Sequence, residues 1–358
     1  MATWINRRGA CVAAMLGLAA APAFAQSDVP LQDTVHFFTY ENDARYNTDR
    51  LYTSGVQFST KRSRDERGRF ARAWTGALCR IAGCENATLL TSQTNVGQLI
   101  YTPQDITVAT PQPYDRPWAG LLYYEQVYAF LSADQRTLTT LTAQAGLTGP
   151  ASLAEPAQKL LHRLLDRPRP EGWSHQIGGS LAVLASVEQR RAVDALSTDL
   201  WRGVRLNTAA YWRVAGGTLM NYGAVGMAVV IGKDLPLVSP PPPGIGNKMR
   251  PSARSFDLTS CMASWVQCTA FASVEVRYVG QNLFLDGRPW RDDPSVRRRR
   301  IVHDVVAGLR LDLPETRTAS HGPWFVQLKV TRRSSEFKGP VAQPRRHVVA
   351  GLTIGTEF

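Results

Sequence analysis

Beyond the first 25 residues, apolar and polar positions alternate with a period of two along most of the chain. In the segment 273–279, Val274, Val276 and Tyr278 share one face, and the polar residues Ser273, Glu275 and Arg277 share the other. The same alternation recurs in 302–312 and in the last segment of the chain. A period of two is typical of β-strands with one apolar face. Strands of a soluble sandwich alternate in the same way, so alternation alone does not decide which face meets lipid.

Twelve such segments follow one another, and they are long enough to cross a bilayer at a tilt. An even number of strands is typical of bacterial outer-membrane barrels, and the chain ends on an aromatic residue, Phe358, as such barrels often do. We therefore predict an all-β fold: a twelve-stranded antiparallel transmembrane β-barrel with a short helix in an extracellular loop. The predicted strands are 33–42, 51–62, 92–101, 117–130, 136–147, 173–189, 198–214, 219–232, 269–280, 299–312, 322–333 and 345–357.

The N-terminal segment has the pattern of a secretory signal. Arg7 and Arg8 precede the apolar run 11–21, and Ala23 and Ala25 form a small-x-small cleavage site. We predict that residues 1–25 are removed and that 26–358 form a single barrel domain. No later apolar run approaches the ~18 residues of a membrane-spanning helix. The remaining classes are a soluble secreted protein and a membrane β-barrel.

Charge and cysteine content fit an exported protein. Loss of the signal lowers the formal charge from +12 to about +10. For an exported chain, this charge favours an anionic membrane surface as partner over nucleic acid. The mature chain keeps the close cysteine pairs Cys79/Cys84 and Cys261/Cys268. We favour two disulfides over a zinc site, because no histidine lies near either pair.

The barrel hypothesis sorts the connections between strands into two groups. If both termini are periplasmic, the polar, motif-rich segments YTPQDI, YDRPWAG, QNLFLDG and SSEFKGP all fall on or beside outer connections. Two long inner connections, about 63–91 and 233–268, fit less well and carry the cysteines. The six outer connections are 43–50, 102–116, 148–172, 215–218, 281–298 and 334–344.

The sequence predicts one clear helix, in the third outer connection. Ser152 is suited to cap it, Glu155 follows at capping-box spacing, and Pro156 suits a first turn. Gln158 and His162 lie four residues apart and therefore project from one face. An apolar stripe is expected to rest against the barrel wall or the lipid interface. It consists of Leu153, Leu160, Leu161 and Leu164.

The first outer connection carries more polar chemistry than a turn requires. The stretch 41–55 reads ENDARYNTDRLYTSG and joins two alternating segments. A hairpin turn needs only two to five residues containing Gly or Asn. The surplus of carboxylate, amide, guanidinium and hydroxyl groups marks this loop as a functional segment.

Five motifs in register resemble the outer-membrane lipid A 3-O-deacylases of the LpxR type. They are the first hairpin, YTP with DRPWAG, GLTGPASL with the following Gln, His and GW, QNLFLDG, and SSEF with its Gly. The resemblance spans nearly the whole mature chain. It implies a monomeric twelve-stranded outer-membrane barrel that removes the 3'-linked acyloxyacyl group of lipid A in lipopolysaccharide. It also implies calcium, a histidine-activated water, and a site near the extracellular leaflet, between the barrel wall and a loop helix.

The resemblance assigns roles to matched positions. His162 is the expected general base, and Asn42 and Asp43 are expected in catalysis and as calcium ligands. Thr53 orders the site or contacts substrate, or it is simply a strand residue facing the lumen. Gln158 orients the base or the sugar. Arg116 and Arg50 are expected to meet lipid A phosphates, although Arg50 also fits a structural ion pair with its neighbour Asp49.

Two departures from the family pattern leave substrate placement open. Pro113 and Tyr114 stand where some relatives have basic residues, and Asp166 has no confident counterpart. A phospholipase-like esterase is therefore a second candidate function. A non-catalytic barrel, either a pore or a lipopolysaccharide-binding protein, is a third.

Overall fold

The computed structural model describes residues 34–43, 51–63, 65, 67–200, 204–233, 235–238, 267–313, 324–339 and 346–357. Several predicted features lie outside these residues: the signal segment 1–25, Asp49, Arg50, Cys261 and the terminal Phe358. No helix in the described ranges is both long enough and apolar enough to cross a membrane.

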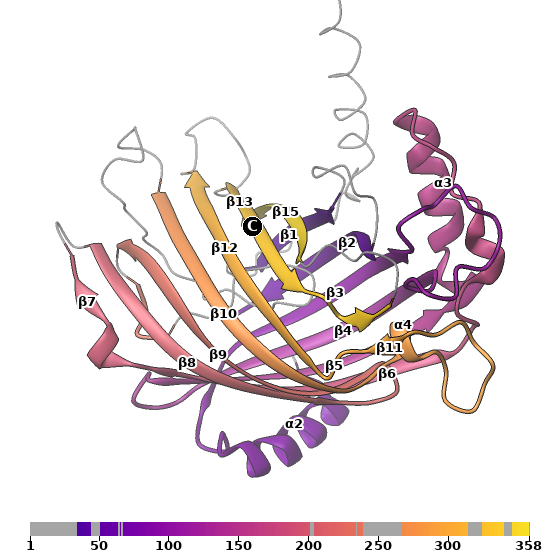
Figure 1. The fold of residues 1–358 in the computed structure, drawn as a ribbon. Helices are drawn as coiled ribbons and strands as arrows, with labels where there is room; N and C mark the ends of the chain where they lie inside the picture. Colours follow the sequence, from indigo (N-terminus) through magenta and orange to yellow (C-terminus); the bar gives the residue numbers. More distant parts are fainter. Residues whose placement is uncertain are drawn as a thin grey trace, which may run out of the picture. The chain divides into compact units, whose positions relative to one another are not determined.

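Twelve long antiparallel strands form a closed barrel in the described part of the chain (Figure 1). Each strand pairs with the next along the chain, β6 pairs with β8 across a minor strand, and β1 pairs with β15 to close the ring. Three two-residue strands are accessory: β7 (Thr198–Asp199) extends β8, and β11 (Arg297–Arg298) pairs with β14 (Phe337–Lys338). The ring consists of β1 (Thr34–Asn42), β2 (Leu51–Arg62), β3 (Thr88–Thr102), β4 (Ala119–Leu131), β5 (Thr137–Thr148), β6 (Leu181–Ala192), β8 (Val204–Gly216), β9 (Met220–Lys233), β10 (Gln267–Asn282), β12 (Ile301–Leu313), β13 (Trp324–Ser334) and β15 (Arg346–Glu357).

The predicted barrel is thereby confirmed, with errors at three strand boundaries. The segment predicted from 173 becomes a strand only at Leu181, because Gly172–His175 forms a 3-10 turn with Trp173 fully buried. The segment predicted from 198 splits into β7 and β8, and β3 starts four residues early, at Thr88.

Burial along each strand shows which face meets lipid. Val274, Val276 and Tyr278 are each more than half exposed, whereas Glu275 on the same strand is buried. Charged side chains therefore point inward and apolar ones outward, the reverse of a soluble sandwich. An apolar outer surface around a polar interior is the arrangement of a membrane barrel.

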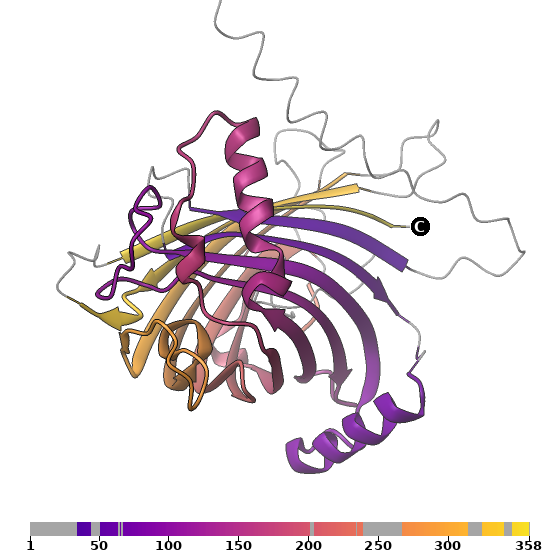
Figure 2. The same cartoon turned by 90° about the vertical axis from the view of Figure 1, so that its right-hand side faces the viewer.

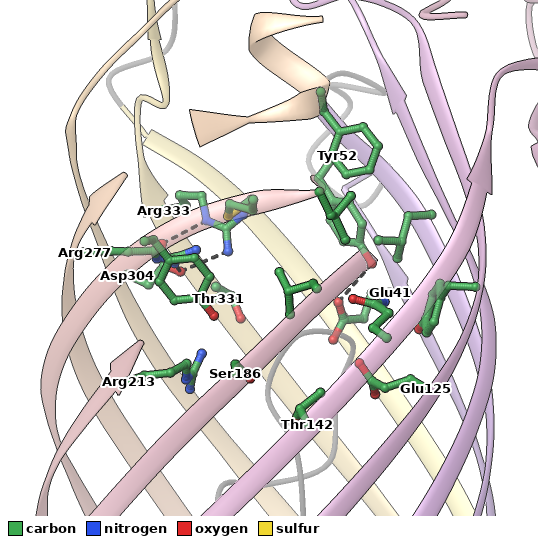
Figure 3. A pocket seen from close by; sticks show the side chains of 18 of the residues that line it. Glu41, Tyr52, Glu125, Thr142, Ser186, Arg213, Arg277, Asp304, Thr331 and Arg333 are labelled. Atoms are coloured by element: carbon green, nitrogen blue, oxygen red, sulfur yellow. Dashed lines mark hydrogen bonds and ion pairs between the residues drawn. The ribbon is translucent and has the colours of Figure 1, made fainter. Parts of the chain in front are cut away.

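Charged side chains meet inside the barrel in an unbroken series of ion pairs. Glu188, for example, accepts hydrogen bonds from Arg190 at 2.6 Å and from Arg213 at 2.7 Å. Such pairing offsets the cost of removing these charges from water. Part of the series lines one wall of an interior cavity of about 190 Å³ and faces Glu41 and Glu125 across it (Figure 3). We call this series the interior charge chain; its members in order are Arg190, Glu188, Arg213, Glu275, Arg277, Asp304, Arg333, Glu336 and Arg116.

An apolar cluster occupies the interior beside this cavity. The short helix α4 (Leu283–Asp286) contributes Phe284, whose ring stacks on Tyr101 at 4.5 Å between centroids. Asn282 caps α4, because its Oδ1 accepts a hydrogen bond from the Phe284 amide at 3.0 Å. The QNLFLDG motif thus supplies packing for the barrel interior. The cluster consists of Tyr52, Leu99, Tyr101, Ala119, Leu121, Tyr123, Ile177, Ala182, Leu219, Leu283, Phe284 and Val349.

A helix that the sequence analysis missed lies in the first long inner connection. This helix, α2 (Arg69–Ala82), ends at Gly83, and a disulfide joins Cys79 in its last turn to Cys84. The disulfide prediction for this pair is confirmed, and zinc is excluded there because the thiols are oxidised. Cys268 is also disulfide-bonded. Figure 2 shows α2 at one end of the barrel and the predicted loop helix, α3 (Ala154–Leu164), at the other.

Candidate active site at the α3 end of the barrel

The end of the first hairpin brings the main chains of three predicted site residues close together. Asn42 pairs with Ser54 across β1 and β2, and the Asp43 amide donates to the Thr53 carbonyl at 3.4 Å. The Thr53 hydroxyl lies 2.6 Å from the hydroxyl of Thr102 on β3. Thr102 alternates with the inward-facing Tyr101, so this hydroxyl pair lies on the outer side of the wall.

The loop helix covers the same outer wall. α3 (Ala154–Leu164) lies along one side of the barrel end (Figure 2). Ala154 packs against Ile100 of β3, and only a glycine at position 120 of β4 leaves room for it. The Gln98 amide on β3 donates to the Ser152 carbonyl at 2.7 Å and fixes the start of the helix. Thr53 and α3 are therefore both anchored to the outward side of β3.

The predicted helix cap is wrong in detail. Ser152 ends a 3-10 turn, and Leu153, in a left-handed conformation with φ 56°, occupies the cap position without a side-chain cap bond. The Ser152 hydroxyl donates to the Gly149 carbonyl at 2.6 Å, and its oxygen accepts a hydrogen bond from the amide of Ala154, the first residue of the helix, at 3.4 Å. Glu155 does not complete a capping box, because its carboxylate accepts from Lys159 one turn later.

The face of α3 that packs on the barrel is short and polar, and its leucines point outward. Ala154, Gln158 and His162 are the buried residues of the helix. Leu160 and Leu164 are each more than half exposed. Of the two expected positions for the leucines, exposure fits the lipid interface and not the barrel wall.

Two neighbours hold Gln158 and His162 in place. The Trp173 indole N–H donates to Gln158 Oε1 at 2.9 Å. Gln158 Nε2 is buried and has no hydrogen-bond partner among the described residues. His162 Nδ1 lies 2.6 Å from the Pro168 carbonyl oxygen. Because a carbonyl oxygen only accepts, Nδ1 carries the proton, and Nε2 is the basic nitrogen of the neutral ring.

Arg116 is placed as a member of the interior charge chain. It is 1% exposed, and its Nη1 donates to Glu336 Oε2 at 2.7 Å. Its guanidinium also stacks on Tyr101 at 4.4 Å. Burial would raise the pKa of Glu336, but Arg116 and Arg333 more than offset this and lower that pKa to about 2. These contacts give Arg116 a packing and charge-balancing role.

Comparison with known proteins places this architecture in a family. The family model described as "Outer membrane protein LpxR" matches residues 11–358. The chain belongs to the LpxR family. Family and barrel together assign the protein to the outer membrane.

One of three similar solved structures supports the same fold. LpxR from Salmonella typhimurium is similar with a TM-score of 0.67 and 17% identity, covering 91% of this chain and 100% of that chain. The KdgM porin has a TM-score of 0.33 and 7% identity, covering 90% of this chain and 99% of that chain. The translocator domain of the autotransporter NalP from Neisseria meningitidis has a TM-score of 0.36 and 9% identity, covering 98% and 96%. Only the first similarity is close enough to inform the fold. Among curated proteins, no sequence matches.

Within this LpxR-family barrel, the predicted calcium ligands suit calcium in kind but are few in number. Asn42 and Asp43 offer amide and carboxylate oxygens, the donors that a hard cation prefers. Calcium takes about six to eight oxygens. Nowhere in the described ranges do three His, Cys, Asp or Glu residues gather closely enough to hold a metal.

Two residues of the candidate site in this LpxR-family chain were not predicted from the sequence. His347 on β15 is buried, and its Nε2 lies 3.7 Å from Asp43 Oδ2. Trp173 holds Gln158 and also packs against Trp118 at 5.0 Å. His347 lies two positions before Val349 and shares its inward face of the strand, and this pattern was a signal for His347. The WAG and GW sequences gave no comparable signal for the pairing of the two tryptophans.

Proposed function

We propose that this protein is a lipid A 3-O-deacylase that hydrolyses the 3'-linked acyloxyacyl ester of lipopolysaccharide lipid A. The observation that carries the proposal is His162, buried on a helix against the outer barrel wall with Nδ1 held by the Pro168 carbonyl. That bond makes Nε2 the basic nitrogen of the ring, and this nitrogen is proposed to act on water. A site on the outer wall suits a substrate that stays in the membrane.

The reaction follows ordinary ester chemistry. His162 Nε2 takes a proton from a water molecule, and the resulting hydroxide adds to the ester carbonyl carbon. The tetrahedral intermediate then expels the sugar 3'-oxygen, which receives the proton from the imidazolium. The products are the free acyloxyacyl acid and a 3'-hydroxyl on lipid A. Gln158 Nε2 donates to the substrate, either to the oxyanion or to the sugar.

Asn42 and Asp43 are proposed to hold a calcium ion, with Thr53 ordering the hairpin end around them. When bound, calcium would supply positive charge toward the ester oxyanion. The described contacts join Asp43 to Thr53 and His347, and they join His162 to Pro168. In this proposal, substrate or metal bridges the hairpin and the helix.

The active site is proposed to lie near the extracellular leaflet, where lipid A resides. The exposed leucines of α3 support this placement, because a helix at the lipid boundary presents apolar side chains to acyl chains. Arg50 and Arg116 are both proposed to contact the phosphates of lipid A. The burial of Arg116 and its bond to Glu336 make Arg50 the better candidate.

Among the alternative functions, a pore is disfavoured because side chains occupy the barrel interior. A pore requires an open, hydrated lumen, whereas here the interior charge chain and the apolar cluster around Phe284 occupy part of the interior. A phospholipase-like esterase would use the same histidine and stays the second candidate. Substrate assays separate the two.

The deciding experiment is mass spectrometry of lipid A from cells that express the wild type or His162→Gln. We expect loss of one 3'-linked acyloxyacyl group with the wild type alone. A difference in migration between unheated and boiled samples on SDS gels would show that both barrels are folded. Unchanged lipid A with released phospholipid acyl chains would instead establish the esterase, and unchanged lipids of both kinds would remove the enzyme proposal.

A further inference from the structure

The helix α2 lies on the outside of the barrel, at the end opposite to α3 (Figures 1 and 2). Tyr128 and Phe130 of β4 have the same outward parity as Tyr124, which is half exposed, yet both are buried. Trp74 of α2 packs on Tyr128 at 5.6 Å between ring centroids. The helix therefore covers part of the lipid-facing wall.

One stripe of α2 accounts for this contact. The buried or half-buried positions recur every three or four residues, as expected for a helix lying on a surface. The Cys79–Cys84 disulfide and a hydrogen bond from Gln189 Nε2 to the Ala82 carbonyl at 3.1 Å fix its C-terminal end. The stripe consists of Ala71, Trp74, Thr75, Leu78, Cys79 and Ala82.

The barrel covers only part of the apolar surface of α2. Phe70 is 84% exposed and Ile81 is 83% exposed. At about 100° per residue, these two side chains project within roughly 20° of each other, beside the stripe that packs on the wall. Two large apolar side chains on one exposed face, next to a lipid-facing wall, are adjacent to the acyl chains of the bilayer.

The opposite side of α2 is basic. Arg69, Arg72 and Arg80 are exposed, and the helix contains no acidic residue. Arg80 approaches Glu85 only at 3.8 Å, with both side chains largely in solvent. An apolar sector joined to an arginine-rich sector is the pattern of a helix that lies in the membrane interface.

We propose that α2 is an interfacial helix that binds anionic phospholipid in the leaflet at its end of the barrel. Phe70 and Ile81 enter the acyl region, and the three arginines bind phosphate headgroups. Arg67 does not take part, because its guanidinium is bound by Asp65 and stacks on Phe130 at 5.1 Å. This role is independent of the deacylase proposal.

The test places a nitroxide label on single cysteines in the mature barrel, reconstituted into lipid nanodiscs and labelled without reductant so that the disulfides stay intact. Phe70→Cys and Ile81→Cys report on the apolar side. Gly76→Cys is the matched control on the basic side, where a side chain has open space. We expect the ratio of oxygen to nickel-chelate accessibility to be several-fold higher at 70 and 81 than at 76. Equal, water-like ratios at all three positions would overturn the proposal.

A second measurement tests the lipid preference. Native mass spectrometry would count phosphatidylglycerol retained from discs that also contain phosphatidylethanolamine. Replacing Arg69, Arg72 and Arg80 together by Gln should lower phosphatidylglycerol retention several-fold, because each basic residue contributes to the attraction. Replacement of all three by Lys should preserve it. Equal retention in the Gln variant would overturn the anionic preference.

Discussion

Arg116 and Glu336 are joined by a hydrogen-bonded ion pair of 2.7 Å inside the barrel, although 220 positions separate them in sequence. Arg116 belongs to the DRPWAG motif and Glu336 to the SSEF motif. Both segments resemble functional motifs of the family, and their opposite charges neutralise each other inside the barrel. Glu336 is also 3.6 Å from Arg333, which continues the interior charge chain.

Arg116→Ala should therefore destabilise the barrel. The variant leaves the Glu336 carboxylate buried with only the more distant Arg333, at a cost of about 1–3 kcal/mol. Urea unfolding of the detergent-solubilised protein measures this loss. The folded fraction is read from the difference in migration between unheated and boiled samples on SDS gels. Arg169→Ala is the matched control, because Arg169 is largely exposed. If Arg116 binds lipid A phosphate instead, the Ala variant will raise KM with little change in stability.

The same pair predicts an acid-dependent loss of stability. The pKa of Glu336 falls from an ordinary 4.5 to about 2 in the folded barrel, so its contribution is complete above about pH 4.5 and is lost as the pH falls toward 2. The full effect is on the order of 3 kcal/mol. Unfolding midpoints of the wild type and of Glu336→Gln, measured from pH 6 to 2, test this. The difference between the two proteins should shrink across that window; a constant difference would contradict it.

The sequence predicted the barrel well because strand alternation is a local signal. The residues that face lipid in β10, such as Val274 and Val276, already share one parity in the sequence. The helix α2 was missed because its apolar sector is divided between the wall and the exposed Phe70 and Ile81. Because the segment also contains several arginines, its sequence indicated a polar connection.

The site was predictable in its residues but not in its contacts. His162 and Gln158 share a helix face at i and i+4, and the structure buries both. Arg116 is buried beside Glu336, and Asp43 is buried beside His347. Pairings between such distant positions follow from barrel closure, which no local pattern encodes.

Trp173 is predicted to act as a positioning residue through Gln158. Trp173→Phe keeps most of the buried ring but removes the N–H that Gln158 Oε1 accepts at 2.9 Å. Loss of one such bond costs about 1 kcal/mol, so kcat should fall by roughly five- to tenfold with a smaller change in KM. Kinetics on purified lipid A measure both constants. The control is Trp290→Phe, since Trp290 is almost fully exposed; equal kinetics for the two variants would contradict the role.

Removal of calcium tests whether Asn42 and Asp43, at the end of the first hairpin, hold a calcium ion that the reaction needs. We expect a chelator to abolish deacylation and added Ca²⁺ to restore it. Asp43→Asn should raise the Ca²⁺ concentration for half-maximal activity by about tenfold or more, because a neutral amide binds a hard cation more weakly than a carboxylate does. Calorimetric titration of Ca²⁺ into the folded protein provides a readout that does not depend on turnover.

Asp105→Asn is the matched control for Asp43→Asn. Asp105 is an exposed carboxylate in the connection between β3 and β4, and it bonds only to Thr107 in the contacts described. Its substitution should leave the titration unchanged. Full activity of the wild type after chelation would remove calcium from the mechanism. Activity restored by Zn²⁺ and not by Ca²⁺ would instead favour a site that uses the imidazole of His347 beside Asp43, because a nitrogen ligand suits zinc better than calcium.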